Sequence, residues 1–306
     1  MKTVKAWISA ARLKTLPLSL AGVVFGSFAA KKDGFWDSSV FIFALTTTLC
    51  FQILSNFAND LGDSQKGTDD NNRLGPVRAV QSGIISKSQM KFAVILMSLL
   101  SVLSACFLLM VANKDPLTFM SNQLILAYLI ASVLSIAAAI MYTMGSKAYG
   151  YRGFGDLFVF IFFGLVSVIG SYGLFSKTIE LELFLPAITI GLLSVAVLNL
   201  NNMRDIVNDQ KYGKMTVVVK LGAKNAKSYH FYLFAIAAAT LAIFISFPKF
   251  SPIYWITFLP FIVLGIHIKK VIQVTDPKEY DAELKKVALS TFLIALLFAL
   301  TCYFAK

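Results

Sequence analysis

The sequence predicts an all-α polytopic membrane protein in which about nine helices cross a bilayer. Of its 306 residues, 57% are hydrophobic and only 14% are charged, whereas a soluble domain has roughly 25% charged residues. The mean hydropathy is +0.72. The apolar residues are gathered in runs of about 20, the length of helix that spans the hydrocarbon core. Because little sequence remains between the runs, we expect one integral-membrane domain over residues 1–306.

The apolar runs give the positions of the expected spans in chain order. Each run is long enough to cross a bilayer and is followed by polar or charged residues. The first and eighth runs are the shortest and contain Pro17 and Pro260, so we expect these two helices to be the least regular. The expected spans are 13–30, 39–59, 90–113, 123–144, 155–175, 179–200, 228–247, 252–268 and 286–304.

Lysine and arginine residues are unevenly divided between the two ends of these spans. Roughly 22 of the 28 lie on one side, which the positive-inside rule assigns to the cytoplasm. We therefore predict a multi-pass protein of the cell inner (cytoplasmic) membrane with a cytoplasmic N-terminus. No small-residue cleavage site follows a short apolar core at the N-terminus, so no removed signal peptide is expected.

A net charge of +12 would also suit a protein that binds nucleic acid. Topology already accounts for these cations, so we expect membrane lipid and no nucleic acid as partners. Cys50, Cys106 and Cys302 lie in apolar runs without the spacing of metal ligands, which is typical of packing residues. His230 and His267 lie near helix ends in apolar surroundings and are predicted to be packing or interface residues.

Two acidic clusters lie on the predicted cytoplasmic side, each at the end of an apolar run. Asp60 and Asp63 are three residues apart, and Asp205 and Asp209 are four apart, so each pair shares one face of a helix. In both clusters an Asn stands four residues before the first Asp, and a Gly stands four residues after the second. We expect these two glycines to allow a left-handed backbone at the end of each helix.

Acidic residues at the end of membrane spans are costly and mark functional sites. Carboxylates suit Mg²⁺, which also binds water and phosphate oxygens. Zinc and iron are disfavoured, because neither cluster has a His or Cys nearby. We predict that Asp60, Asp63, Asp205 and Asp209 hold Mg²⁺ and a polyphosphate between two helix ends. The alternative, that these carboxylates only cap or solvate helix ends, does not explain two matching clusters.

Cations near the clusters are candidates for binding a diphosphate, because Arg contacts phosphate oxygens in pairs and Lys supplies a point charge. Arg73 and Arg78 are favoured, since the Gly-Pro turn between them can return this segment over the site. The inside-positive topology explains each cation equally well. The candidates are Lys66, Arg73, Arg78, Arg204, Lys211 and Lys214.

A third segment on the same side, residues 142–156, is rich in Gly, Tyr and cations. Tyrosine faces can stabilise a developing cation, and a Lys or Arg could hold an anionic acceptor. An interfacial aromatic belt is the alternative. Asp156 opens the next helix, either as a carboxylate favoured by the helix dipole or as a base for an acceptor hydroxyl. The candidate catalytic residues are Tyr142, Lys147, Tyr149, Tyr151, Arg152 and Asp156.

Taken together, the clusters form a pattern with a known counterpart. The motifs Asn56-x2-Asn59-Asp60-x2-Asp63 and Asn202-x-Arg204-Asp205-x3-Asp209 resemble the two aspartate-rich motifs of the UbiA superfamily of intramembrane prenyltransferases. Segments 12–17, 75–83 and 149–156 resemble the branch that prenylates 1,4-dihydroxy-2-naphthoate in menaquinone synthesis. The superfamily pattern has a further Asp four residues after Asp63; this sequence has Gly67 there, and Asp69 is the candidate replacement as a metal ligand.

The resemblance implies a bundle of nine spans around a central cavity. The two motifs would bind Mg²⁺ and the diphosphate of a polyprenyl diphosphate, with Asn56, Asn59 and Asn202 among the diphosphate-binding residues. The acceptor would be 1,4-dihydroxy-2-naphthoate, prenylated with loss of CO₂ to give demethylmenaquinone. Two alternatives stay open: another acceptor, such as 4-hydroxybenzoate, haem or a phospholipid precursor, and a cation-coupled transporter, whose acidic residues would lie nearer the middle of the membrane.

Overall fold

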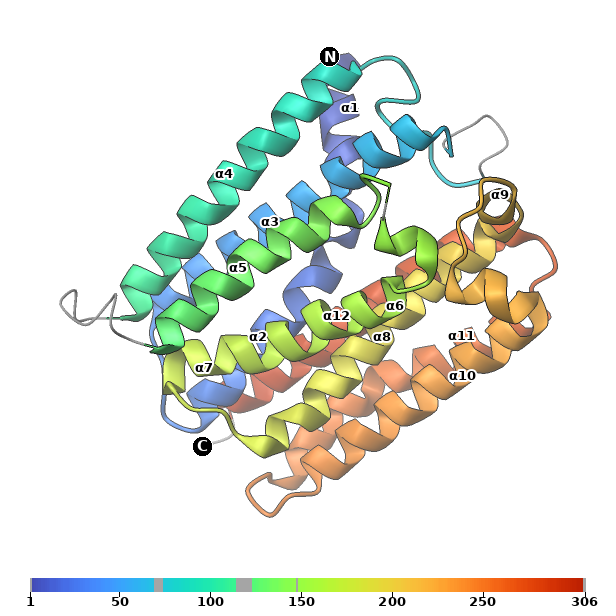
Figure 1. The fold of residues 1–306 in the computed structure, drawn as a ribbon. Helices are drawn as coiled ribbons and strands as arrows, with labels where there is room; N and C mark the ends of the chain where they lie inside the picture. Colours follow the sequence, from blue (N-terminus) through green and yellow to red (C-terminus); the bar gives the residue numbers. More distant parts are fainter. Residues whose placement is uncertain (1, 69–73, 114–122, 147, 305–306) are drawn as a thin grey trace.

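The computed structural model describes residues 2–68, 74–113, 123–146 and 148–304, and within these ranges it contains helices and no strand. Asp69, Arg73 and Lys147, which belong to the predicted site, lie outside the described residues. Figure 1 shows the arrangement of the helices. The α-helices are α1 (Lys2–Ala11), α2 (Leu16–Lys32), α3 (Ser38–Lys66), α4 (Lys87–Ala112), α5 (Gln123–Met141), α6 (Gly155–Val159), α7 (Ser171–Ser176), α8 (Phe184–Arg204), α9 (Ile206–Lys211), α10 (Val217–Ile245), α11 (Leu259–Gln273) and α12 (Tyr280–Phe304).

The expectation of about nine spans is confirmed. Among the described residues, eight helices are long and apolar enough to cross a membrane, and α1 with α2, bent by 44°, gives a ninth. The helix α6, the π-helical segment η4 (Phe160–Gly170) and α7 form one continuous span. The helix α3 extends seven residues beyond the predicted span, from residue 59 to Lys66. The first acidic cluster is therefore helical.

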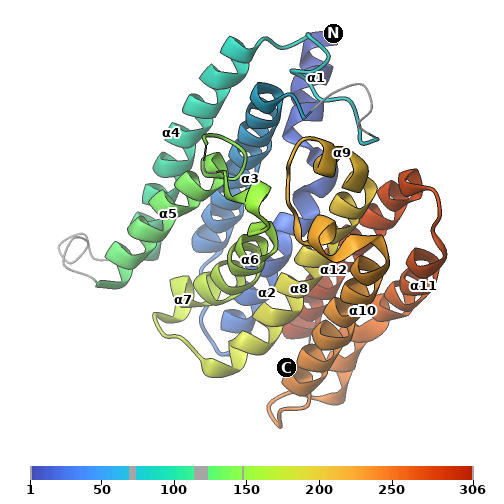
Figure 2. The same ribbon diagram turned by 45° about the vertical axis from the view of Figure 1, so that its right-hand side comes forward.

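The central layer of the bundle consists of α2, α8 and α12. It lies between α3, α4 and α5 on one side and α10 and α11 on the other (Figures 1 and 2). The outer helices expose large apolar side chains, among them Leu99 of α4 and Ile130 of α5, as expected for surfaces in contact with lipid.

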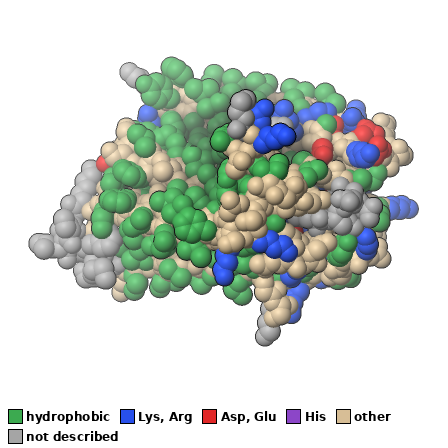
Figure 3. Space-filling view, turned by 90° about the horizontal axis from the view of Figure 1, so that it is seen from above, with side chains coloured by type: hydrophobic (Ala, Val, Ile, Leu, Met, Phe, Trp, Pro, Cys, Tyr) green, Lys and Arg blue, Asp and Glu red, His purple; other side chains and the backbone are tan. Residues whose placement is uncertain are grey.

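One end of the bundle, which we call the polar end, contains the end of α3, the short helix α9 and the start of α12 (Figure 1). In Figure 3, most of the charged side chains gather on the right of the view, where this end lies, and hydrophobic side chains cover much of the remainder. Gly67 (φ 71°) and Gly213 (φ 67°) end the two cluster helices in the left-handed conformation, which confirms the expectation for both glycines.

Glycines bring the central helices close together. A Cβ atom on Gly26 of α2 would lie 2.1 Å from the carbonyl oxygen of Val168 in η4, and one on Gly164 of η4 would lie 2.5 Å from the carbonyl oxygen of Ala187 in α8. Small residues at such crossings let membrane helices approach closely. The packing of α2, η4 and α8 is thereby fixed, and all three segments line the same cavity.

We expect Gly26→Ala to lower the free energy of unfolding by about 1–3 kcal/mol, because the added methyl group meets backbone that cannot move aside. Gly265→Ala on α11 is the matched control, since no atom lies within 4 Å of a Cβ at that position. Thermal unfolding of both variants in detergent tests this prediction. Equal midpoints for the two variants would contradict the packing described above.

Candidate active site

The first acidic cluster is buried on α3 and points toward residues from other segments. Both Asp60 and Asp63 are less than 5% exposed. Asp63 accepts a hydrogen bond from the Tyr151 hydroxyl (2.8 Å) and pairs with the Arg78 guanidinium (2.8 Å). Asp60 accepts one from the backbone N–H of Ala79 (3.2 Å). The segment 75–83 thus returns over α3, as predicted from its turn, and places Arg78 at the cluster.

The second cluster lies where α8 ends and α9 begins. The backbone at Asp205 leaves the helical conformation (φ −99°, ψ 10°) and separates α8 from α9. Asp209 follows one turn later, and its backbone N–H donates to the Asp205 carbonyl oxygen (2.8 Å), so the two residues keep the helical spacing that the sequence predicted. Arg204 donates to both carboxylate oxygens of Asp205 and also pairs with Asp281 of α12. Lys214 pairs with Asp209 (3.3 Å).

Asp209 is 3% exposed. Burial raises the pKa of its carboxyl group, and the nearby Lys214 ammonium opposes that rise. A buried carboxylate that retains a neighbouring cation can stay ionised. A further cation at Asp209 would oppose the effect of burial in the same way as Lys214 and favour the ionised carboxylate.

Tyr151 joins the two clusters. Its hydroxyl lies 2.9 Å from the hydroxyl of Thr68 and donates to Asp63. Thr68 in turn accepts, at its carbonyl oxygen, a hydrogen bond from the Asn208 side chain (2.9 Å), which is 140 residues further along the chain. The Tyr151 ring also contacts two ammonium groups, Lys66 at 3.8 Å and Lys214 at 5.7 Å from the ring centre. One aromatic side chain thus contacts residues of both clusters.

The residues of the two clusters fit a divalent cation. Several buried oxygen atoms have no hydrogen-bond partner within the described residues: Asn59 Oδ1, Asp60 Oδ1, Asn202 Oδ1, Asn208 Oδ1 and Asp209 Oδ2. Such oxygens are costly to bury unless a ligand satisfies them. No group of three or more His, Cys, Asp or Glu converges on one point in the described part of the chain. Mg²⁺ suits this arrangement, because it binds through few carboxylates plus waters and phosphate oxygens.

A cavity of about 410 Å³ runs from the clusters into the bundle. The part of the cavity at the polar end of the bundle, which we call the head of the cavity, is lined by polar and charged residues: Arg12, Asn56, Asn59, Asp63, Arg78 and Lys214. The walls of the cavity are mostly apolar and come from α2, α3, α5, η4 and α8. Aromatic side chains follow one another along one wall: Tyr142 and Tyr149 (5.3 Å between ring centres), then Phe158 (4.0 Å) and Phe162 (6.2 Å). The cavity can hold a molecule with an anionic head and an apolar tail.

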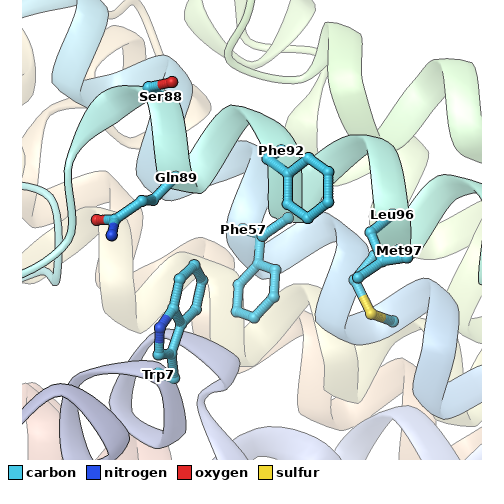
Figure 4. A pocket seen from close by; sticks show the side chains of 8 residues that line it. Trp7, Phe57, Ser88, Gln89, Phe92, Leu96 and Met97 are labelled. Carbon is cyan, nitrogen blue, oxygen red and sulfur yellow. The ribbon is translucent and has the colours of Figure 1, made fainter.

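A second, more open groove of about 610 Å³ lies between α1, α3 and α4 (Figure 4). In that view Trp7, Phe57 and Phe92 face the space, and Ser88 and Gln89 lie at one side. None of the eight residues that line this groove belongs to the predicted site.

Some predicted site residues serve other purposes in the structure. Asn56 donates to the carbonyl of Ala11 (2.9 Å), which holds α1 and the adjacent Arg12 against α3. Lys211 is exposed and lies over the Tyr212 ring, and the Arg152 side chain is also exposed.

Asp156 was predicted as a cap or a base. It accepts a hydrogen bond from the Tyr229 hydroxyl (2.9 Å), and it is absent from the cavity lining. The structure therefore pairs its carboxylate with a residue of α10.

Sequence reasoning missed four residues of the polar end: Arg12, Thr68, Asn208 and Asp281. Arg12 lies in a segment whose resemblance was noted, but its side chain had no assigned role. It adopts a left-handed backbone (φ 52°) and lines the cavity. Thr68, Asn208 and Asp281 carry no local signal, because each acts through a contact with a distant part of the chain.

Comparison with known proteins agrees with this geometry. The pattern of the UbiA prenyltransferase family matches residues 19–297, so the chain belongs to the UbiA prenyltransferase family. It is similar to the 1,4-dihydroxy-2-naphthoate octaprenyltransferases of Haemophilus influenzae (41% identity, covering 97% of this chain and 95% of the relative) and Escherichia coli (40% identity, covering 99% and 96%).

The fold is also similar to solved structures. A UbiA homologue from Aeropyrum pernix K1 superposes with a TM-score of 0.68 at 18% identity, covering 94% of this chain and 97% of that one. A UbiA homologue from Archaeoglobus fulgidus, bound to DMAPP and Mg²⁺, gives 0.63 at 14% identity, covering 97% and 99%. At these identities the likeness extends to the fold alone.

We expect Tyr151→Phe to lower kcat/KM for prenyl transfer by about tenfold or more, because it removes the hydrogen bond to the Asp63 carboxylate and leaves the ring between the two lysines. Tyr232→Phe, at an exposed position on α10, is the control and should retain the wild-type rate. Steady-state kinetics of the purified variants tests this. A wild-type rate for Tyr151→Phe would show that the link between the clusters does not matter for the reaction.

Proposed function

We propose that this protein transfers a polyprenyl chain from polyprenyl diphosphate to 1,4-dihydroxy-2-naphthoate, with loss of the acceptor carboxylate as CO₂, to give demethylmenaquinone in its quinol form. One observation carries the proposal: two acidic clusters meet at the head of a mostly apolar cavity. A polyprenyl diphosphate has the same division into an anionic head and an apolar tail. The relatives named as naphthoate prenyltransferases, which are 41% and 40% identical over nearly the whole chain, support the choice of acceptor.

We infer Mg²⁺ as the cofactor. Asp60, Asp63, Asp205 and Asp209 would hold it, together with the amide oxygens of Asn59 and Asn202, which have no hydrogen-bond partner among the described residues. When bound, it would neutralise charge on the departing diphosphate. Two solved structures of a UbiA homologue from Archaeoglobus fulgidus, described as bound to Mg²⁺ with DMAPP or with GPP, support the inference.

The cations at the head of the cavity act on the diphosphate. Arg12, Arg78 and Lys214 line this end, and we expect them to bind its oxygens and stabilise the negative charge that builds up as the C–O bond of the donor breaks. The electron pair of that bond leaves with the diphosphate, and an allylic cation remains. Because Arg78 and Lys214 are held in place by ion pairs with Asp63 and Asp209, little reorganisation is needed.

The aromatic wall would protect the allylic cation. The rings of Tyr142, Tyr149 and Phe158 follow the polar end of the cavity, and aromatic faces attract cations. Burial raises the pKa of the Tyr142 and Tyr149 hydroxyl groups, so both stay protonated and do not trap the cation as phenolates. The apolar walls exclude water, which would otherwise hydrolyse the intermediate.

The acceptor completes the reaction without a protein base. The ring carbon that carries the carboxylate attacks the allylic cation and forms the new C–C bond. The electron pair of the C–CO₂⁻ bond then returns to the ring as CO₂ leaves, which restores the aromatic system. No ring proton has to be removed, and this agrees with the position of Asp156, which is bound to Tyr229 and absent from the cavity lining.

We also propose that the polar end faces the cytoplasm from the cell inner membrane. The support is the positive-inside rule: roughly 22 of the 28 Lys and Arg residues lie on the side of the acidic clusters.

We expect Asp60→Asn and Asp209→Asn each to lower the rate of prenyl transfer by about 10²-fold or more, because each removes a buried carboxylate from the two acidic clusters. Asp276→Asn is the control: this Asp caps a short turn outside the clusters. Rates are measured with saturating Mg²⁺ and polyprenyl diphosphate, and size-exclusion profiles establish that the variants fold. A rate for either cluster variant within twofold of wild type would remove that residue from the site.

The acceptor is tested by incubating the purified protein with polyprenyl diphosphate, Mg²⁺ and one acceptor at a time. We expect 1,4-dihydroxy-2-naphthoate labelled in its carboxylate to release labelled CO₂ in step with the prenylated product, and chelation of divalent cation to stop both. Product with 4-hydroxybenzoate and none with the naphthoate would overturn the acceptor assignment. Ion-coupled transport in vesicles without any prenylated product would overturn the enzyme assignment.

A further inference from the structure

A closed ring of polar contacts joins four helices beside the second acidic cluster. It runs from α8 to α10, α11 and α12 and returns to α8. The link that closes the ring is the ion pair between Arg204 of α8 and Asp281 of α12. Polar contacts of this kind inside a membrane bundle are costly and indicate a function.

The buried part of the ring has one consistent pattern of donors and acceptors. The Asn199 amide nitrogen donates to the carbonyl of Ala226 and to His230 Nδ1 (3.4 Å), so His230 carries its proton on Nε2. His230 Nε2 then donates to His267 Nε2 (2.9 Å), and His267 Nδ1 donates to Glu283 (2.7 Å). Asn199, His230, His267 and Glu283 are each no more than 1% exposed. Both histidines are buried, as packing residues would be, but they also form a polar chain.

The two acids at the start of α12 lie on opposite sides of that helix. Glu283 and Asp281 are two residues apart, which is about 200° around an α-helix. Glu283 faces His267 of α11, and Asp281 faces Arg204 of α8. The buried chain therefore fixes the position of the helix that carries Asp281.

Arg204 is the reason that Asp281 matters. Its side chain is 3% exposed and donates to both oxygens of the Asp205 carboxylate. If Asp205 turns to a bound cation, the buried guanidinium loses that partner, and an unpaired buried charge is strongly unfavourable. Asp281, whose side chain is 43% exposed, lies against the same guanidinium and can remain with it.

We propose that Asp281 is a positioning residue: it holds Arg204 so that Asp205 is available to a divalent cation. This inference rests on the proposed function, because it assumes a metal at the second cluster. It deepens that proposal by adding a residue from α12, outside both aspartate-rich motifs. The test therefore measures cation binding directly, without substrate and without turnover.

The experiment titrates Mn²⁺ into the purified full-length protein in detergent and follows free Mn²⁺ by electron paramagnetic resonance. We expect Asp281→Asn to raise the Kd for Mn²⁺ about tenfold, as is typical when a residue that orients a metal ligand is lost. Asp281→Glu should restore affinity to within about threefold of wild type. Glu279→Gln is the matched control, since it removes the same charge from a nearby exposed acid that pairs with Lys270, and it should bind Mn²⁺ as wild type does.

A double-mutant cycle separates positioning from a general loss of negative charge. In an Arg204→Gln background, Asp281→Asn should have no further effect on Mn²⁺ binding. An equal further loss in that background, or an Asp281→Asn affinity equal to that of Glu279→Gln, overturns the inference. If Asp281→Asn does not fold, Glu283→Gln replaces it. We expect Glu283→Gln to raise the Kd for Mn²⁺ by less than the tenfold expected for Asp281→Asn, and a Kd equal to that of wild type overturns the inference. Absence of Mn²⁺ binding by the wild-type protein would instead refute the metal assignment itself.

Discussion

The hydrogen bond from Tyr151 to Asp63 is the interaction on which the polar end depends. It is made by a residue of the segment between α5 and α6, and the same hydroxyl lies against Thr68, which accepts from Asn208 of α9. Through these contacts, helices far apart in sequence come together around one space. Carboxylates buried in an apolar bundle are unfavourable unless they are paired and hydrogen-bonded. Arg78, Lys214 and Tyr151 supply those partners.

The same pairing explains how the site can be ready for a charged ligand. Cations and acids hold one another in place, while several buried oxygens of the two clusters have no hydrogen-bond partner among the described residues. An anionic ligand would bind the cations, and the divalent cation that it brings would bind the oxygens that lack a partner. Farther from the polar end, the cavity is lined mainly by apolar and aromatic side chains, which suit a long hydrocarbon chain. The division of the site into two parts follows from the position of the acidic clusters at the ends of α3 and α8.

The sequence was sufficient to predict the number of spans, the clustering of acids at one end and the glycines that end the cluster helices. These features depend on local composition and on helical spacing. The Gly-Pro turn before Arg78 was also sufficient to predict that this segment can return over the site, whereas the pairing of Arg78 with Asp63 is seen only in the structure. The family assignment agrees with the motifs at residues 56–63 and 202–209.

Features that depend on distant packing could not be predicted in this way. The break at Asp205, the contact of Asn208 with Thr68 and the pairing of Arg204 with Asp281 each need the bundle to be assembled first. His230 and His267 were predicted to be packing or interface residues from their largely apolar surroundings, although each finds a polar partner on another helix. Asp156 is similar: the local pattern indicated a helix start, and its partner Tyr229 comes from α10.

The central claim is that both acidic clusters bind one metal-bound diphosphate. An experimental structure with Mg²⁺ and an unreactive polyprenyl thiodiphosphate tests it most directly. Our account predicts the metal in contact with carboxylates of both clusters, and diphosphate oxygens within ion-pair distance of Arg78 and Lys214. A diphosphate bound by only one cluster, or held outside the cavity between α3 and α8, would contradict it.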